Sequence, residues 1–270
     1  MSEELITVVM PIFRTPDHYV RESIKSILAQ DYAHLELIII EDPSENIVEG
    51  IIREFCDARI NYVLNPRRTS FVQQLNKGIG LAKGVFIARM DADDISESHR
   101  LRLQQLFLQE HPDITAVGSN LMVIDEQGAF MGSRAYPEGS EDIAIKMRIR
   151  NVMAHPAVMF RKKDYLEVGG YDEDFDTIAD YHLWIKMLQA GKKIYNIQQP
   201  LLRYRVHFGA TKGYLLKKQL RDTLRIKKKY FRYKKGWNSF CEMRFMSEYM
   251  MTALPSRWIY ALFVKFNIRK

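Results

Sequence analysis

The sequence predicts an α/β protein in which a mostly parallel, mixed β-sheet is flanked by helices, with a basic helical extension at the C-terminus. Apolar, β-branched runs alternate with segments of helical periodicity, each about a dozen residues long. The 270 residues are 47% hydrophobic and 27% charged, which suits a chain with a substantial core. Basic and aromatic residues gather in residues 212–270. These observations exclude a disordered chain and a disulfide scaffold.

Four strands are predicted in the first half, and the first of them is a continuous apolar run, as expected for a strand buried on both faces. They cover residues 5–13, 35–40, 60–64 and 85–90. Apolar residues at helical spacing predict helices between them, at 18–29, 45–56 and 71–83. Strands separated by helices of this length indicate βαβ units and therefore a parallel sheet.

The second half is predicted to contain shorter elements and to complete the sheet at a mixed edge. Helices are expected at 100–110, 141–149, 163–168 and 180–190. Strands are expected within 114–125 and at 157–160, 193–197 and 201–206. We therefore expect a body over residues 1–211 and a separate, mostly helical extension over residues 212–270.

The formal net charge of +7 conceals an asymmetry between these two parts. Residues 212–270 contain 16 Lys and Arg, three acids and 12 of the 31 aromatic residues, a local net charge of +13. Such a segment can lie on an anionic membrane surface or contact nucleic acid. The remaining interpretation is a solvated helical subdomain with a charged outer face. No apolar run reaches the roughly 18–20 residues that span a bilayer.

Two acidic clusters follow predicted strands, where ligands bind in open parallel sheets. One is Glu41-Asp42, and the other comprises Asp91, Asp93 and Asp94. Three carboxylates so close together repel one another unless a cation compensates them, and they suit a hard divalent ion that also takes phosphate oxygens. The alternative is that Asp94 or Ser96 caps the following helix, which would leave the other carboxylates unexplained.

Two common nucleotide-binding classes are disfavoured by the sequence. No G-x-G-x-x-G follows the first strand, and no Walker-A sequence occurs. Gly78 and Gly80 lie inside a predicted helix instead of at a strand end. What remains is a nucleotide enzyme that handles a diphosphate through a metal.

Five segments in one order along the chain resemble glycosyltransferase family 2. They are VVMPIF, SIKSILAQDY, LIIIEDPSEN, LNKGIGLAKGVFIARMDADD and HPAVMF…GGYDE…DYHLW, within about residues 5–207. The resemblance implies the Rossmann-like GT-A fold, with a nucleotide-sugar half at about 1–110 and an acceptor half at about 111–211. It also implies inverting transfer from a nucleotide-diphosphate sugar, most simply a UDP-sugar. Residues 212–270 lie outside it.

On the donor side, the resemblance assigns roles to residues at the end of the first strand and after the second. Pro11 and Phe13 would line the nucleobase pocket, and Asp42 would accept a hydrogen bond from the base. Independently of the resemblance, Arg68 and its neighbour Arg67 follow the third predicted strand, where a guanidinium suits a clamp on base or phosphate and a solvated loop charge is the equal alternative.

The segment Asp91-Ala92-Asp93 matches the D-x-D element of the family, and Asp94 matches its acidic neighbour. The resemblance implies that these residues hold Mn²⁺ or Mg²⁺, the ribose and the diphosphate. His207 lies where family members often present a basic residue to the metal or diphosphate.

On the acceptor side, Asp180 matches the catalytic base, and a helix N-cap is its structural alternative. His155 is expected to face the acceptor or the diphosphate, or to be a hydrogen-bonded structural residue. Trp184 is an acceptor-side candidate that its helical spacing also places in the core. Two departures from the family pattern are Pro43 after Asp42 and Ala179 before Asp180, and they leave an inactive member as an alternative.

The predicted function is metal-assisted sugar transfer to a glycan or lipid-linked glycan acceptor in cell-surface polysaccharide biosynthesis. The expected location is the cytoplasm, with peripheral attachment to the inner face of the plasma membrane through residues 212–270. The rivals are a nucleotidyltransferase that makes nucleotide sugars and a basic nucleic-acid-binding protein. Nucleic acid is not expected as a partner, because that reading gives Asp91, Asp93 and Asp180 no role.

Overall fold

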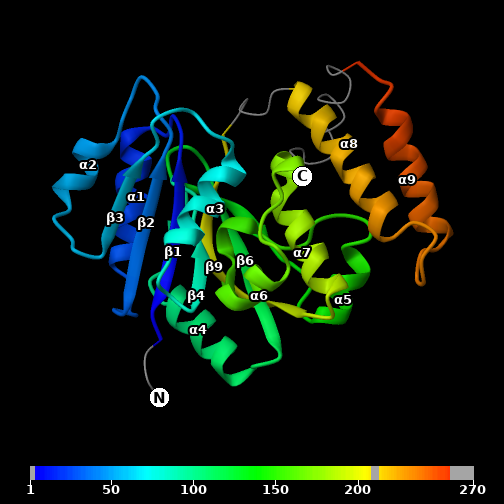
Figure 1. Ribbon diagram of the computed structural model, residues 1–270, viewed down its shortest axis with the longest axis horizontal. Helices are drawn as coiled ribbons and strands as arrows, with labels where there is room; N and C mark the ends of the chain where they lie inside the picture. Colours follow the sequence, from blue (N-terminus) through cyan, green and yellow to red (C-terminus); the bar gives the residue numbers. More distant parts are fainter. Residues whose placement is uncertain (1–3, 208–212, 256–270) are drawn as a thin grey trace.

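The computed structural model of the chain describes residues 4–207 and 213–255. Within these residues, nine strands form one mixed sheet in the order β3-β2-β1-β4-β8-β6-β9-β5, with β7 paired to β6 (Figure 1). The strands are β1 (Ile6–Ile12), β2 (Leu35–Glu41), β3 (Ile60–Leu64), β4 (Phe86–Arg89), β5 (Ile95–Ser96), β6 (Ile114–Ile124), β7 (Phe130–Arg134), β8 (Met159–Arg161) and β9 (Lys193–Arg205).

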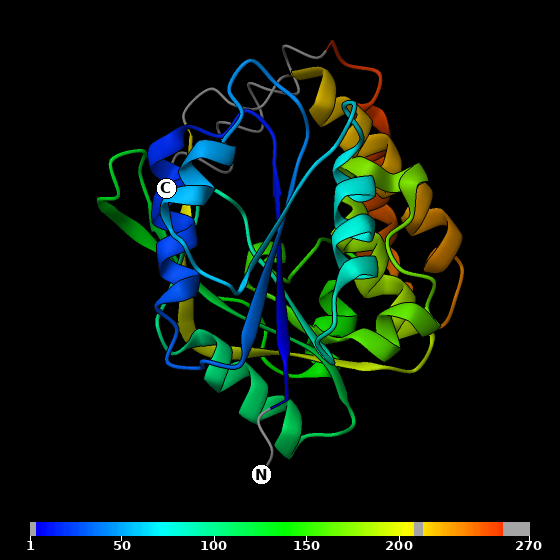
Figure 2. The same cartoon turned by 60° about the vertical axis from the view of Figure 1, so that its left-hand side comes forward.

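Helices cover both faces of this sheet, as the view in Figure 2 makes plain. They are α1 (Asp17–Leu28), α2 (Glu49–Glu54), α3 (Phe71–Leu81), α4 (Arg100–Glu110), α5 (Ser140–Lys146), α6 (Lys162–Glu167), α7 (Ala179–Gln189), α8 (Gly213–Tyr230) and α9 (Ser239–Met251), with the 3₁₀ helices η1 (His155–Ala157) and η2 (Glu173–Ile178). The α/β class expected from the sequence is confirmed.

The sheet is parallel from β3 through β2 and β1 to β4, and β8 then reverses the direction. The pair β6 and β9 is parallel again. The two strands expected at 193–197 and 201–206 are one strand, β9, with shifts of register opposite residues 119–121 of β6. Pro200 lies in this irregular stretch, where a missing backbone N–H costs least.

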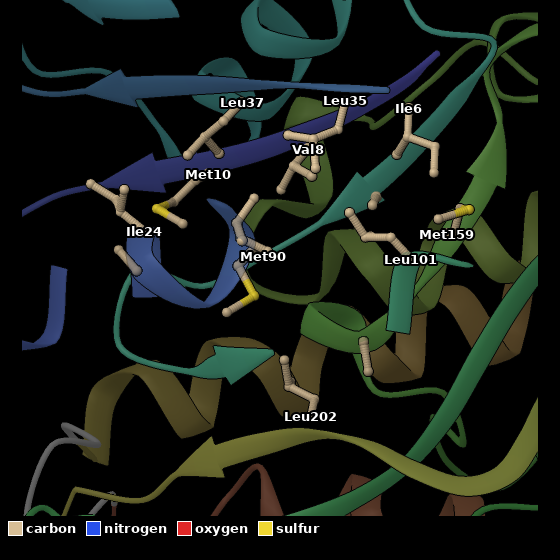
Figure 3. Close-up of a cluster of buried hydrophobic side chains, with 14 of the residues drawn as sticks. Ile6, Val8, Met10, Ile24, Leu35, Leu37, Met90, Leu101, Met159 and Leu202 are labelled. Atoms are coloured by element: carbon tan, nitrogen blue, oxygen red, sulfur yellow. The ribbon is translucent and has the colours of Figure 1, made fainter. Parts of the chain in front are cut away.

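The core lies on the two faces of the sheet. In β1, Ile6, Val8 and Met10 face one layer with Leu37, and Val9 faces the other (Figure 3). Burial of each such side chain contributes about 1.5–3 kcal/mol. This buried arrangement holds the carboxyl ends of β1, β2 and β4 side by side.

Helix α3 packs unusually close to β1 because Gly78 faces the strand. A Cβ atom on Gly78 would lie 2.6 Å from the Val9 side chain, a distance that packed carbons do not tolerate. A capping box between Ser70 and Gln73 fixes the start of α3. The sequence therefore sets both the position and the beginning of this helix.

Helices α8 and α9 confirm the expected helical character of the extension within the described residues, and the apolar run at 258–264 lies outside them. Helix α8 packs on η2 and α7 and shares the second core layer through Ile226 and Phe231. Asp222 accepts a hydrogen bond from Thr177 at 3.1 Å. The described part of the extension is therefore continuous with the core of the body.

No helix in residues 4–207 or 213–255 is long and apolar enough to cross a membrane.

Replacement of the fully buried Ile226 by Ala should lower the free energy of unfolding by about 2–5 kcal/mol, because it leaves a cavity where α8 meets the body. Chemical denaturation measures this change. Ile145→Ala, at an isoleucine that is 53% exposed, is the matched control and should stay within about 0.5 kcal/mol. Equal stability of the two variants would contradict a shared core.

Candidate active site

The acidic residues predicted from the sequence lie at the carboxyl ends of the parallel strands. Asp91, Asp93 and Asp94 follow β4, and Asp42 follows β2. His207 follows the end of β9. Because β1, β2 and β4 are neighbours and run the same way, these side chains come to one edge of the sheet.

The three carboxylates after β4 form a compact cluster, with oxygens that lie within 4.8 Å of one another. Burial and the neighbouring Asp91 raise the pKa of Asp93. Burial, followed by repulsion from Asp91 and Asp93, raises the pKa of Asp94 well above its usual value. His207 Nε2 lies 2.8 Å from Asp93 Oδ2 and is the nearest compensating group for that carboxylate.

Asp94 is fully buried and is not a helix cap, which corrects one alternative reading of the sequence. Its Oδ1 accepts a hydrogen bond from the backbone N–H of Arg205 at 2.8 Å. Its Oδ2 has no hydrogen-bond partner among the described residues. Helix α4 begins at Arg100, after His99, so neither Asp94 nor Ser96 lies at its start.

These observations fit a hard divalent cation. Carboxylate oxygens are the donors that Mg²⁺ and Mn²⁺ prefer, and a buried oxygen without a partner is costly unless a cation or a donor meets it. Asp91, Asp93 and Asp94 would hold such an ion, and His207 offers an imidazole nitrogen next to Asp93.

Arg205 fastens the end of β9 to this cluster, a role that the sequence did not reveal. Its Nε donates to the carbonyl of Asp93 at 2.8 Å, and its Nη2 lies 2.6 Å from Glu22 on α1. The guanidinium also stacks over the Tyr19 ring at 4.3 Å. The sequence offered only an arginine at the end of a predicted strand, and its burial comes from the packing of distant parts of the chain.

Arg89 is a second buried cation that sequence reasoning missed. It is the last residue of β4, and its Nη1 lies 2.5 Å from Asp91 Oδ2. The guanidinium also lies over the Phe71 ring at 5.2 Å. Within the described part of the chain, its Nε and Nη1 have no well-formed hydrogen bond. Its positive charge also acts on Asp180, where burial raises the pKa of the carboxyl and Arg89 opposes that rise.

Asp180 lies in the first turn of α7, one residue inside the helix, and Ile178 occupies the N-cap position. The N-cap interpretation of Asp180 is therefore wrong. Asn151 Nδ2 donates to Asp180 Oδ2 at 2.6 Å. Burial raises the pKa of the Asp180 carboxyl, and the Tyr181 backbone N–H, Arg89 and Asn151 oppose that rise. The result is a half-buried carboxylate in a defined position.

His155 and Trp184 lie beside each other in an aromatic cluster. His155 Nε2 lies 2.6 Å from the Tyr171 hydroxyl. Burial and the charge of Arg89 hold the pKa of His155 well below its usual value, which favours the uncharged ring. Trp184 is fully buried in the second core layer and has no surface to offer an acceptor, which corrects its acceptor-side assignment.

Two of the residues predicted to contact the nucleobase lie against each other. The Arg68 guanidinium lies 4.4 Å above the Phe13 ring, so these two predicted residues meet, whereas Pro11 and Ala92 are buried. Asp42 is also buried, and its base contact stays a prediction.

Asp42 already has protein partners on both of its oxygens. It accepts hydrogen bonds from Asn65 at 2.7 Å and from the Thr69 N–H at 2.6 Å. Burial raises the pKa of Asp42, but these hydrogen bonds outweigh it and hold the pKa below its usual value. Asp42 therefore orders the loop at residues 65–69, and a nucleobase N–H would share the carboxylate with these donors.

Asp93→Asn should weaken binding of Mn²⁺ by about tenfold or more, because it removes one anionic ligand from the cluster. Isothermal titration calorimetry with Mn²⁺ alone measures this affinity. Asp113→Asn is the control, since Asp113 is exposed and pairs with Lys193 at 2.9 Å away from the sheet edge. Unchanged Mn²⁺ affinity in Asp93→Asn would contradict the metal assignment.

Comparison with known proteins agrees with this geometry. The family that matches the chain is Glycosyl transferase family 2, over residues 7–169. The O-antigen biosynthesis glycosyltransferase WbnJ of Escherichia coli is 34% identical over 214 residues, which cover 77% of this chain and 82% of WbnJ. An uncharacterized glycosyltransferase of Methanocaldococcus jannaschii is 33% identical over 211 residues, which cover 76% of this chain and 72% of that protein.

The solved structures of TarS from S. aureus share the fold. The full chain of TarS superposes with a TM-score of 0.67 at 13% identity over 92% of this chain, which spans 43% of TarS. TarS residues 1–349 in complex with UDP give the same TM-score at 13% identity, covering 90% of this chain and 70% of that one. The GT-A fold expected from the sequence is confirmed, and the chain belongs to glycosyltransferase family 2.

Proposed function

We propose that this glycosyltransferase moves a sugar from a UDP-sugar to a hydroxyl group of a cell-surface polysaccharide precursor, with inversion at the anomeric carbon. One observation carries the proposal: a carboxylate cluster suited to a divalent ion contacts Arg89 through Asp91, and the charge of the same arginine opposes the rise that burial causes in the pKa of Asp180. The similarity to an O-antigen biosynthesis enzyme supports the substrate class, and the likeness to a UDP-bound structure supports the donor.

On the donor side, the protein supplies charge and position. Asp91, Asp93 and Asp94 would hold Mn²⁺ or Mg²⁺, with His207 beside Asp93. A bound divalent ion supplies Lewis-acid stabilisation of the charge that develops on the departing diphosphate. Arg205 fixes the backbone of Asp93 relative to α1, so the cluster is organised before the donor binds.

On the acceptor side, Asp180 is the proposed general base. Asn151 holds one of its oxygens, and Arg89 opposes the effect of burial and favours the carboxylate form. The acceptor hydroxyl loses its proton to Asp180 as it attacks the anomeric carbon, an effect of roughly 10²–10⁴-fold on rate. Attack opposite the leaving diphosphate inverts the stereocentre and requires no covalent intermediate.

The acceptor and location belong to the same proposal. A glycan carried on a lipid would place the acceptor at a membrane, and the net charge of +13 over residues 212–270 would attract the chain to an anionic leaflet. We therefore propose a cytoplasmic enzyme attached peripherally to the inner face of the plasma membrane.

The rival function of nucleotidyl transfer has less support. Such an enzyme needs a glycine-rich, basic segment after the first strand to hold a triphosphate, and here β1 continues into Phe13-Arg14-Thr15-Pro16. The family matched by residues 7–169 is one of glycosyl transfer.

Asp180→Asn should retain donor binding and lower the rate of transfer by roughly 10²–10⁴-fold, because the amide cannot accept the acceptor proton. Donor affinity from calorimetry and turnover from release of UDP separate the two effects. Asp174→Asn, at an exposed acid on η2, is the matched control and should leave both unchanged. Normal turnover in Asp180→Asn would rule out its assignment as base.

Arg89→Met should shift the acidic limb of the kcat/KM pH profile to higher pH. Burial already raises the pKa of Asp180, and the positive charge of Arg89 opposes that rise. Removal of the charge raises the pKa further, so Asp180 becomes protonated, and activity is lost, at a higher pH than in the unsubstituted protein. Arg89→Lys keeps the charge and should retain most of the original profile. An acidic limb that does not move in Arg89→Met would contradict the electrostatic link.

A further inference from the structure

The outer face of α9 carries an apolar stripe that the transfer reaction does not use. Phe240, Met243, Met246 and Met250 are 54%, 63%, 42% and 64% exposed, and their spacing places them on one side of the helix. Figure 1 places α9 at the outer edge of the molecule, with α8 between it and α7. Four large apolar side chains on one exposed helix face indicate a contact with something apolar.

Both carboxylates of α9 are neutralised away from this stripe. Glu242 lies 2.6 Å from Arg232 and accepts a hydrogen bond from Trp237 Nε1 at 2.8 Å. The buried Glu248 lies 2.6 Å from Lys227 and 2.9 Å from Arg244. Helix α9 therefore contributes no unpaired negative charge to the stripe.

The segment of the chain that carries this stripe is strongly basic. Exposed cations of α8 and of the turn that follows it are Lys218, Arg221, Arg225, Lys228, Lys229, Lys234 and Lys235. The 59-residue segment from 212 to 270 has a net charge of +13, so two copies of this surface would repel each other. An occupant must instead combine apolar groups with negative charge, which is the chemistry of an anionic lipid surface. A nucleic acid offers the charge but gives the methionines nothing to contact.

We propose that the α9 face formed by Phe240, Met243, Met246 and Met250 is the membrane-docking element. The four side chains enter the boundary between headgroups and acyl chains, and the exposed lysines and arginines of the same segment attract it to anionic headgroups. This inference rests on the proposed membrane location and deepens it by naming the element that makes the contact.

Docking through α9 would also orient the body of the protein, including the segment that carries Asp180. Helix α8 links α9 to the body through Asp222, which bonds Thr177, and through Tyr230, whose hydroxyl lies 2.9 Å from His182 Nε2. Thr177 and His182 flank Asp180 in the sequence. The membrane contact is thus connected by direct packing to the segment that carries the proposed base.

The test uses the full chain, because α8 shares the core of the body and its removal would disturb the fold. Binding to phosphatidylcholine vesicles with and without phosphatidylglycerol is measured by co-sedimentation. The unsubstituted protein should partition onto the anionic vesicles, and Met243→Glu/Met250→Glu should lower its partition coefficient by about tenfold or more. Met243→Leu/Met250→Leu should retain binding. Met131→Glu, at a methionine that is 51% exposed on β7, is the matched control.

Each other outcome overturns a defined part of the account. No partition of the unsubstituted protein would refute the membrane location, while turnover on a soluble acceptor would still test transfer separately. Equal partition of the Glu variant would overturn the α9 assignment and leave the location standing. Equal binding to neutral vesicles would remove the role of the cations. A dimer in sedimentation velocity that the Glu variant abolishes would assign the face to a second copy of the chain.

Discussion

Mutual repulsion of three carboxylates at the end of β4 is the constraint around which the rest of the site is organised. Asp91, Asp93 and Asp94 have oxygens within 4.8 Å of one another, and two of them are driven towards their protonated forms. The protein meets this cost locally with Arg89 beside Asp91 and His207 beside Asp93. It leaves one oxygen of Asp94 without a partner in the described structure, and a divalent ion would complete the compensation.

The arginines near the carboxylate cluster also link the residues proposed to bind the donor with the residue proposed to act as base. Arg89 ends β4 in the donor half and favours the charged form of Asp180 in the acceptor half. Arg205 ends β9 and holds the backbone of Asp93 against α1. In the proposed function, these two buried arginines at strand ends act on the residues assigned to the leaving diphosphate and on the residue assigned to the attacking hydroxyl.

The sequence predicted those parts of the fold that depend on local pattern. Continuous apolar runs located β1, β2 and β4, and the acids after β4 came from their spacing. The short strand β5 was not predicted from the sequence, because two residues carry no periodicity of their own. This strand is held by pairing with β9. Arg89 and Arg205 were missed because a charged residue at a strand end looks exposed until long-range packing buries it.

The surroundings of two predicted site residues also depend on parts of the chain that are distant in sequence. Trp184 was assigned to the acceptor side as well as to the core, and only the packing of α7 against the sheet decides for the core. For Asp42, the loop at 65–69 supplies hydrogen-bond donors from a distant part of the chain, which the sequence alone could not place.

A crystal structure with Mn²⁺ and a UDP-sugar would test the central claim most directly. The account predicts an anomalous scattering peak for manganese in contact with the Asp93 carboxylate, with the diphosphate beside it and the anomeric carbon facing Asp180. A nucleotide bound elsewhere on the protein, or no manganese peak at the carboxylates after β4, would contradict it.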